Sequence, residues 1–288
     1  MHRATGGSGA ASTAVHAVLA GPARAVEVVA STPAAVYLRT GDPAAPALCL
    51  AAPTAVRVPC AVVLAEALPD RPLVGGGQAG LGRVAVAGFT VRVTRWWRPA
   101  TPRLPAGLDH GRATAWLAGH TTDPLDAAGR ATLGDLVGEL TAPGHGDLAA
   151  VVGRLLGRGP GLTPVGDDVL AGLLVTLSAA GAPAAAMFTA LTAAVRAAIA
   201  PPLAAGDGAA AARTTFVSAA LLWHATNGEC VPELAELLRC LADPTAREPA
   251  WRAATDRVLG VGHSSGAGLA RGVRAGFAAA GSLAGASR

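Results

Sequence analysis

Short valine-rich runs, separated by proline, glycine and aspartate, fill the first third of the chain. Within FTVRVTRW, residues 89–96, apolar and polar side chains alternate, which is the pattern of a half-buried strand. The glycine-rich stretch 75–82 is expected to be a flexible hairpin loop rather than a phosphate cradle, because no parallel-sheet unit surrounds it. Strands are predicted at residues 25–31, 35–40, 47–52, 55–64 and 82–97. Strands of this length and spacing predict a small barrel or an antiparallel sheet.

Beyond a proline-rich connector at residues 98–109, the apolar positions follow a helical period. Leucines fall on one face of the segment 130–140, for example. Further helices are predicted at residues 148–157, 231–241 and 248–260. The sequence therefore predicts an α+β fold, in which a β-rich N-terminal region at residues 1–105 precedes an α-helical domain at residues 106–288.

An uncharged stretch of the helical region, Val169 to Val195, is long enough to meet the simplest criterion for a membrane span. It is interrupted by Gly-Ala-Pro at residues 181–183, however, and much of it is alanine. Two buried helices joined at this turn explain the stretch better, so we expect no membrane partner.

The charged residues exclude some classes of chemistry and of binding partner. The formal net charge is +4, and every basic residue is arginine, which excludes lysine Schiff-base chemistry and a P-loop lysine. Arginines are scattered singly except around Arg92, Arg95 and Arg98, so we expect no nucleic-acid partner.

Cysteine and histidine spacing gives no metal signature. The four cysteines form no CxxC pair and are expected to be reduced core thiols rather than zinc ligands. His224, in an apolar helix, is expected to be a core histidine with its hydrogen bonds satisfied. His110, His120 and His145 are expected in loops, without ligand spacing.

The stretch GRGPGLTPVGDDVLAG, residues 157–172, places two aspartates at a helix start. Thr163 suits the cap and Pro164 the first helical position. One interpretation is structural, because negative charge at Asp167 and Asp168 is favoured by the helix dipole.

The other interpretation is a ligand site, because the structural one leaves four glycines unexplained. Such a loop at a helix N-terminus aims backbone amides at an anion. The aspartates would then bind Mg²⁺, accept hydrogen bonds from an amide substrate, or act as a base. The four glycines are Gly157, Gly159, Gly161 and Gly166.

A second glycine-rich helix start is GVGHSSGAGLARG, residues 260–272, with His263 at its beginning and Ser264 or Ser265 as the cap. An internal repeat and a chance alignment of glycines both remain open. At an offset of 100 residues, the aligned pairs are Gly166 with Gly266, Gly172 with Gly272, and Gly181 with Gly281.

A third helix start carries Arg213, Thr214 and Thr215. An arginine with two hydroxyls is suited to hold a phosphate or a carboxylate. The structural alternative is that both threonines are helix caps.

Together these three motifs resemble one family, the AllH-type subunit of oxamate carbamoyltransferase. The motifs stand here as GRGPGLTPVGDDVLAG, ARTTFVSAALL and GHSSGAGLARG, in the order and spacing of the family, and the resemblance covers roughly residues 92–272. It implies a cytoplasmic transferase subunit of purine degradation and allantoin catabolism, working in a multi-subunit complex. The family reaction converts oxalurate and phosphate into oxamate and carbamoyl phosphate.

The resemblance and the helix starts together assign expected roles. Asp167, Asp168 and His263 are the expected catalytic residues, with His263 as general acid or base. Any metal, such as magnesium, would lie at the two aspartates, although the sequence requires no cofactor. The residues expected to bind substrate or phosphate are Gly159, Gly161, Leu162, Thr163, Gly166, Arg213, Thr214, Thr215, Ser264, Ser265 and Gly266.

Two positions depart from the family pattern, since Val165 replaces a favoured serine and Gly268 a favoured aspartate. These departures leave other functions open. The chain would be a carbamoyltransferase or related acyl-transfer subunit with a small amide or carboxylate substrate, a non-catalytic assembly subunit, or a diverged magnesium-dependent hydrolase or ligase. We expect other subunits, further copies of this chain, or both as partners.

Overall fold

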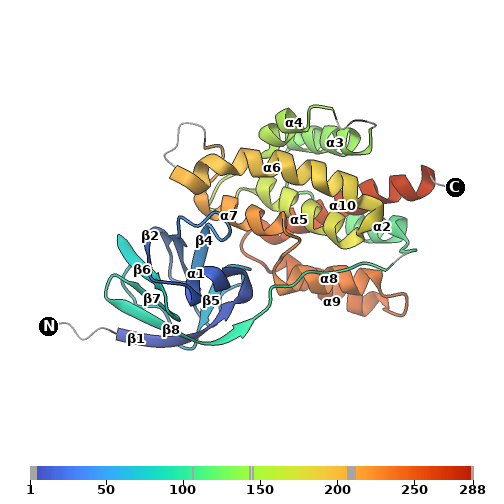
Figure 1. Cartoon of the computed structure of the whole chain (residues 1–288). Helices are drawn as coiled ribbons and strands as arrows, with labels where there is room; N and C mark the ends of the chain where they lie inside the picture. The colour runs from blue at the N-terminus through green and yellow to red at the C-terminus, as the bar shows by residue number, and fades with distance from the viewer. Residues whose placement is uncertain (1–4, 106, 143, 145, 206–211, 287–288) are drawn as a thin grey trace. The chain divides into compact units, whose positions relative to one another are not determined.

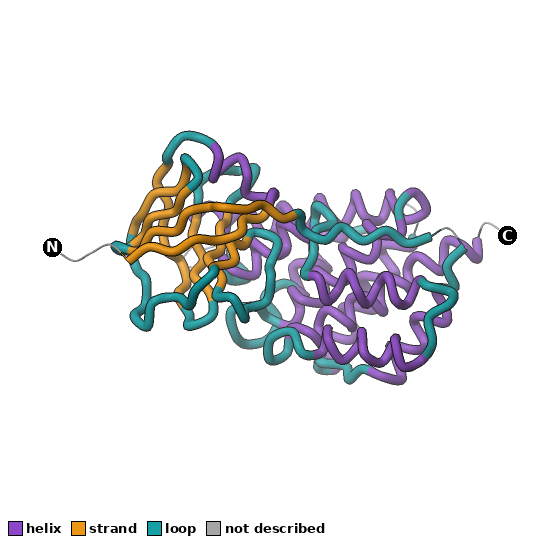
Figure 2. The backbone as a smooth tube through the Cα atoms, turned by 90° about the horizontal axis from the view of Figure 1, so that it is seen from below, coloured by secondary structure: helices purple, strands orange, loops and turns teal. Residues whose placement is uncertain are grey.

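The computed structural model describes residues 5–105, 107–142, 144, 146–205 and 212–286. Contacts between Cα atoms divide the chain into two units, Met1–Pro99 and Ala100–Arg288. The sequence placed the boundary six residues later, inside the proline-rich connector. The first unit contains the strands and the second is helical (Figure 2), so the predicted fold class is confirmed.

Eight strands of the described residues close into a barrel in the order β1-β5-β4-β3-β2-β6-β7-β8 (Figure 1). Most neighbours are antiparallel, but β1 runs parallel to β8 and β4 parallel to β5. Two short helical segments, η1 (Thr13–Val15) and α1 (His16–Ala20), follow the first strand. The strands are β1 (Thr5–Ser12), β2 (Arg24–Ser31), β3 (Ala35–Arg39), β4 (Ala47–Ala51), β5 (Ala61–Leu64), β6 (Gly76–Gly80), β7 (Arg83–Val86) and β8 (Phe89–Trp97).

Two glycine-rich segments behave differently from the sequence prediction. Residues 75–82 were expected to be a flexible loop, but β6 is a paired strand, and only Leu81 and Gly82 form the hairpin turn, both with positive φ. The strand β1 was not predicted at all, because its glycines and small residues have low strand propensity. Hydrogen bonds to neighbouring strands therefore hold β1 and β6 in the strand conformation, although their own sequences have low strand propensity.

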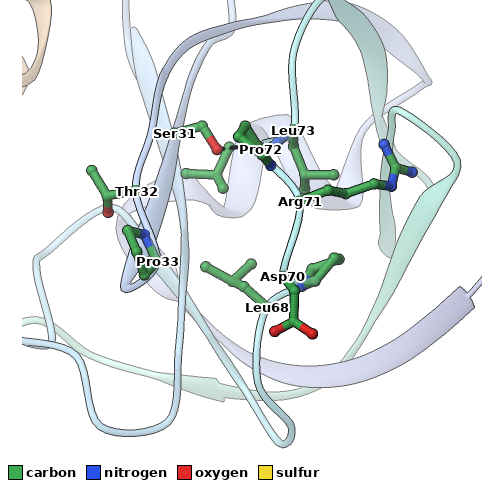
Figure 3. A pocket seen from close by; sticks show the side chains of 10 residues that line it. Ser31, Thr32, Pro33, Leu68, Asp70, Arg71, Pro72 and Leu73 are labelled. Atoms are coloured by element: carbon green, nitrogen blue, oxygen red, sulfur yellow. Dashed lines mark hydrogen bonds between the residues drawn. The ribbon is translucent and has the colours of Figure 1, made fainter.

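One cavity of about 330 Å³ opens on the barrel beside residues 68–73 (Figure 3). Its walls are mainly proline and leucine, and the Ser31 hydroxyl accepts a hydrogen bond from the Leu73 amide across it (3.1 Å). None of the residues predicted to bind substrate lies in this cavity.

The second unit is built from helices joined by short loops. Cys230 pairs with Ala100 in an isolated bridge, which ties the connector to this unit. The helices are α2 (His110–His120), α3 (Ala127–Thr141), α4 (Leu148–Leu155), α5 (Val165–Ala180), η2 (Ala182–Ala184), α6 (Ala185–Ala205), α7 (Phe216–Ala225), α8 (Pro232–Ala242), α9 (Glu248–Leu259) and α10 (Ser265–Ala286).

Several sequence predictions about individual residues are settled by these helices. His224 is a buried residue of α7 and contacts Glu229 (2.6 Å), as expected of a core histidine, and the four cysteines are free thiols. The loop prediction was wrong for His110 and His120, which are the first and last residues of α2, while His145 lies outside the described residues.

The uncharged stretch is split into α5 and α6 at Gly181, as predicted. Helix α5 is buried over most of its length, whereas α6 buries only one face. The segment Ala182–Ala205 is long and apolar enough to cross a membrane by length and composition, with a mean hydropathy of 1.4 and 28% of its most apolar window buried. One such helix is weak evidence, and the described residues give no clear signal of a membrane protein.

Helices α5 and α10 pack against each other at glycines. A Cβ on Gly172 would overlap the backbone of α10 at Leu269, and a Cβ on Gly272 would overlap the backbone of α5 at Val169. Further along, a Cβ on Gly276 would lie 2.6 Å from the Thr176 Cβ. In these contacts the residue numbers increase together along both helices. The two helices therefore run in the same direction, and their N-termini lie at the same end.

The contact between α5 and α10 also tests the alignment of glycines at an offset of 100 residues. Gly172 and Gly272 occupy equivalent places, and a Cβ on Gly166 or on Gly266 would in each case overlap the end of the preceding helix. The third pair is not equivalent, because Gly181 ends α5 with a positive φ of 68° whereas Gly281 lies inside α10. The offset of 100 residues therefore corresponds to matching helix starts and a matching crossing, but not to matching helix ends.

Replacement of Gly272 by alanine should destabilise the protein by about 1–3 kcal/mol, because the new methyl group forces α5 and α10 apart. Gly134→Ala on α3 is the matched control. No atom lies within 4 Å of the added methyl group there, so helix propensity should stabilise the protein by about 0.5–1 kcal/mol. Urea denaturation of both variants measures the difference, and equal effects would contradict the proposed close crossing.

Candidate functional site

The N-termini of α5, α7 and α10 come together in the structure. The Thr163 hydroxyl, just before α5, lies 2.9 Å from the Ser265 hydroxyl at the start of α10. The Thr215 hydroxyl, which caps α7 by accepting from the Ser218 amide, also donates to the Leu162 carbonyl (2.5 Å). Three segments that are far apart in the sequence are thus joined by side chains that the sequence analysis singled out. We call this place the three-helix junction.

Asp167 is the structural centre of the junction. It is 1% exposed, and its Oδ1 accepts from the Gly157 amide (2.7 Å) while its Oδ2 accepts from the Ser218 hydroxyl (2.6 Å) and the Thr214 hydroxyl. Burial raises the pKa of Asp167, and the hydrogen bonds from Ser218, Thr214 and Gly157 oppose this rise. The carboxyl group therefore joins the glycine-rich loop, α5 and α7.

Asp168 is also buried, but its hydrogen bonding differs from that of Asp167. It is 7% exposed, and its Oδ2 is buried without a hydrogen-bond partner among the described residues. The pKa of Asp168 is raised to about 8, mainly by burial; a hydrogen bond from Ser265 opposes the rise and the Asp167 charge adds to it. At neutral pH this carboxyl group is therefore mostly protonated and has a proton to donate.

Close backbone contacts explain why the sequence folds this way locally. Gly157 has a φ of +74°, and a Cβ there would overlap the Arg213 carbonyl. A Cβ on Gly166 would overlap the Leu155 carbonyl at the end of α4. These two glycines let the loop after α4 turn back and bring its amides to Asp167.

The remaining loop residues lie at the surface. Gly159, Gly161 and Leu162 are exposed, with Leu162 43% exposed although it is apolar. Helix α5 begins at Val165 after Pro164, so the helix start was predicted one residue early, and Thr163 bonds Ser265 instead of capping. The loop is therefore presented outward beside the buried aspartates.

Three further residues predicted to belong to the site, Arg213, His263 and Ser264, are also exposed. Arg213 forms no ion pair or hydrogen bond with another described residue, and its guanidinium lies over Gly153, where an added Cβ would be 2.7 Å from Nη1. His263 and Ser264 precede α10, and His263 makes no hydrogen bond to either aspartate. The structure thus brings Thr163, Thr214, Thr215, Ser265 and the aspartates together but leaves His263 outside this network.

Gly268 has a structural role at the junction. An added Cβ would lie 2.6 Å from the Asp168 Cβ, so a larger residue at 268 requires Asp168 to move. Val165, the other departure from the family pattern, is half-buried at the first position of α5. The present position of Asp168 depends on glycine at 268.

Two hydrogen-bond donors to Asp167 were missed by sequence reasoning. Ser218 and the Gly157 amide both donate to Asp167, yet neither was expected to do so. Ser218 lies three residues after the Thr215 cap, which is the only local signal that it faces the junction.

No cluster of three or more histidine, cysteine, aspartate or glutamate residues suited to a metal ion is present in the described parts of the chain. The oxygens of Asp167 already accept three hydrogen bonds. Magnesium at the aspartates stays a prediction.

Residues 155–277 match the model of a protein family described as oxamate carbamoyltransferase subunit AllH. The matched range contains every residue of the three-helix junction, and the resemblance inferred from the motifs is confirmed for these residues. The barrel lies outside the match. No curated protein and no solved structure matches the chain.

Asp168→Asn should make the protein more stable at pH 8. The pKa of Asp168 is about 8 in the folded chain and near 4 in the unfolded chain, so the folded state holds an extra proton between these values. The free energy of unfolding therefore falls as pH rises from about 4 to about 8. The variant lacks this contribution, and denaturant unfolding from pH 5 to pH 9 measures the lost slope.

Asp167→Ala provides the contrast, since it leaves one amide and two hydroxyls without their acceptor and should lower stability by about 2–4 kcal/mol. An Asp168→Asn variant as destabilised as Asp167→Ala at pH 8 would contradict the assigned environments.

Proposed function

We propose that this chain is a carbamoyltransferase subunit that binds phosphate or carbamoyl phosphate, with a small amide or carboxylate substrate of the oxalurate or oxamate kind, at the three-helix junction. The family match supports the coarser part of this statement, because it names a subunit of such an enzyme. The observation that supports the finer part is Asp168, a buried carboxyl group with an unpartnered oxygen at the meeting point of three helix N-termini.

Phosphate suits this position for an electrostatic reason. The dipole of a helix places partial positive charge at its N-terminus, and three such ends come together at the junction. Arg213 adds a full positive charge at Gly153, in the last turn of α4 before the glycine-rich loop. A protonated Asp168 adds no negative charge, so an anion would meet no repulsion from it.

The same carboxyl group would supply the proton that carbamoyl transfer needs. A phosphate oxygen attacks the carbamoyl carbon, a C–O bond forms, and the bond from that carbon to the leaving nitrogen breaks. The leaving nitrogen then takes the proton of Asp168, and the proton that the attacking hydrogen phosphate loses restores the acid form of Asp168, directly or through solvent. Asp167 is assigned a positioning role, because its oxygens are occupied by donors from the loop and α7.

Asp168→Asn should reduce the formation of carbamoyl phosphate from oxalurate and phosphate by about 100-fold or more, since a general acid contributes about 10²–10⁴-fold. The assay uses the chain with its partner subunits. The rate with Asp168 intact should fall as pH rises through about 8, because the acid form is lost. Asp135→Asn, an exposed carboxylate on α3, is the control with unchanged rate. An unchanged rate for Asp168→Asn would favour a non-catalytic assembly subunit.

Arg213→Gln should raise the Kd for inorganic phosphate by about tenfold, since a charge-assisted hydrogen bond is lost. Thermal unfolding of the isolated chain at increasing millimolar phosphate gives the Kd through the shift in Tm. Arg154→Gln is the matched control, because Arg154 is an exposed arginine of α4 paired with Asp135 (3.0 Å). Equal shifts in both variants, or none in the unmodified chain, would count against a phosphate site at the junction.

A further inference from the structure

A cavity of the helical unit lies at the C-terminal end of α5, away from the three-helix junction. It has a volume of about 760 Å³ and is enclosed by the connector residues 101–105 and 107–108, the α5–α6 turn at 178–183, and the start of α2. The connector is held there by a hydrogen bond from the Leu104 amide to the Ala179 carbonyl (2.8 Å). A cavity of this size holds a small organic molecule.

The walls of this cavity are mostly apolar. Prolines and leucines of the connector face alanines and Pro183 of the turn. Asn227 also lines the cavity, but its side chain is already engaged, with Oδ1 accepting from Arg196 (2.7 Å) and Nδ2 donating to the Trp223 carbonyl (3.2 Å). The other polar side chains of the lining are those of Thr101, Arg103, His110 and Ser178, which stand beside the apolar walls.

His110 is one of these polar groups. Its Nδ1 is buried with no hydrogen-bond partner among the described residues, and burial lowers the pKa of the ring, which is therefore neutral at neutral pH. A buried N–H without an acceptor is rarer than a buried lone pair without a donor. The proton of the neutral ring is thus placed on Nε2, and the ring that lines the cavity is a donor there.

Arg103 is the second group. It lines the cavity from the connector, is exposed, and forms no ion pair with another described residue. Arginine presents two parallel N–H groups that match the two oxygens of a carboxylate. An arginine and a neutral N–H donor beside walls of proline, leucine and alanine are complementary to an acid that has an apolar body.

We propose that this cavity binds a small organic acid, whose carboxylate is held by Arg103 and the His110 Nε2–H and whose apolar body fills the space between the connector and the α5–α6 turn. The site is separate from the three-helix junction, since eleven residues of α5 between Asp168 and Ala179 span roughly 16 Å. The proposal does not depend on the proposed transferase function.

Isothermal titration calorimetry with hexanoate tests the proposal. Hexanoate should bind the full chain with a millimolar or lower Kd, whereas 1-hexanol, which lacks the carboxylate, and inorganic phosphate, which lacks the apolar body, should not compete for the site. Arg103→Gln should raise the Kd for hexanoate by about tenfold. Ala182→Trp, at an exposed position of the cavity wall, should abolish binding by filling the space.

Arg154→Gln is the charge-matched control and should bind hexanoate as the unmodified chain does. Asp168→Asn should also leave hexanoate binding unchanged, so that a failure of the junction and a failure of this cavity are distinguishable. No heat of binding with hexanoate, equal binding of 1-hexanol, or an unchanged Kd in both Arg103→Gln and Ala182→Trp would overturn the proposal.

Discussion

The close crossing of α5 and α10 is the contact on which the arrangement of the helical unit depends. Glycines at 172, 268, 272 and 276 let the two backbones approach without intervening side chains. Because the helices run in the same direction, their N-termini and dipoles lie together, and hydroxyl groups connect them to the start of α7. The positive ends of the helix dipoles are therefore side by side, in a chain that contains no lysine.

Asp167 and Asp168 show how position decides the chemistry of identical side chains. They are adjacent in the first turn of α5 and both are buried, yet one accepts three hydrogen bonds and the other has an oxygen without a partner among the described residues. A buried polar group without a partner reduces stability.

The family match and the two ligand-type features all concern the helical unit. The match covers residues 155–277, which include the three-helix junction and both ends of α5. The barrel has its own closed hydrogen-bonding pattern and its own cavity beside residues 68–73. Its contribution to an enzyme complex would therefore involve surfaces that the family motifs do not describe.

The sequence alone determined the fold class, the strand-to-helix order, the division of α5 from α6 at Gly181, and which motifs carry polar side chains at helix starts. These follow from local rules, namely periodicity, proline and glycine placement, and capping. It did not determine that β1 and β6 are strands, since their glycines lack strand propensity and pairing partners decide. Nor could it show that Asp167 is saturated while Asp168 is not, because the Ser218 hydroxyl and the Gly157 amide reach Asp167 only after the chain has folded. Burial, hydrogen-bond partners and the charge of the neighbouring aspartate set the pKa of Asp168, and the first two are properties of the tertiary structure.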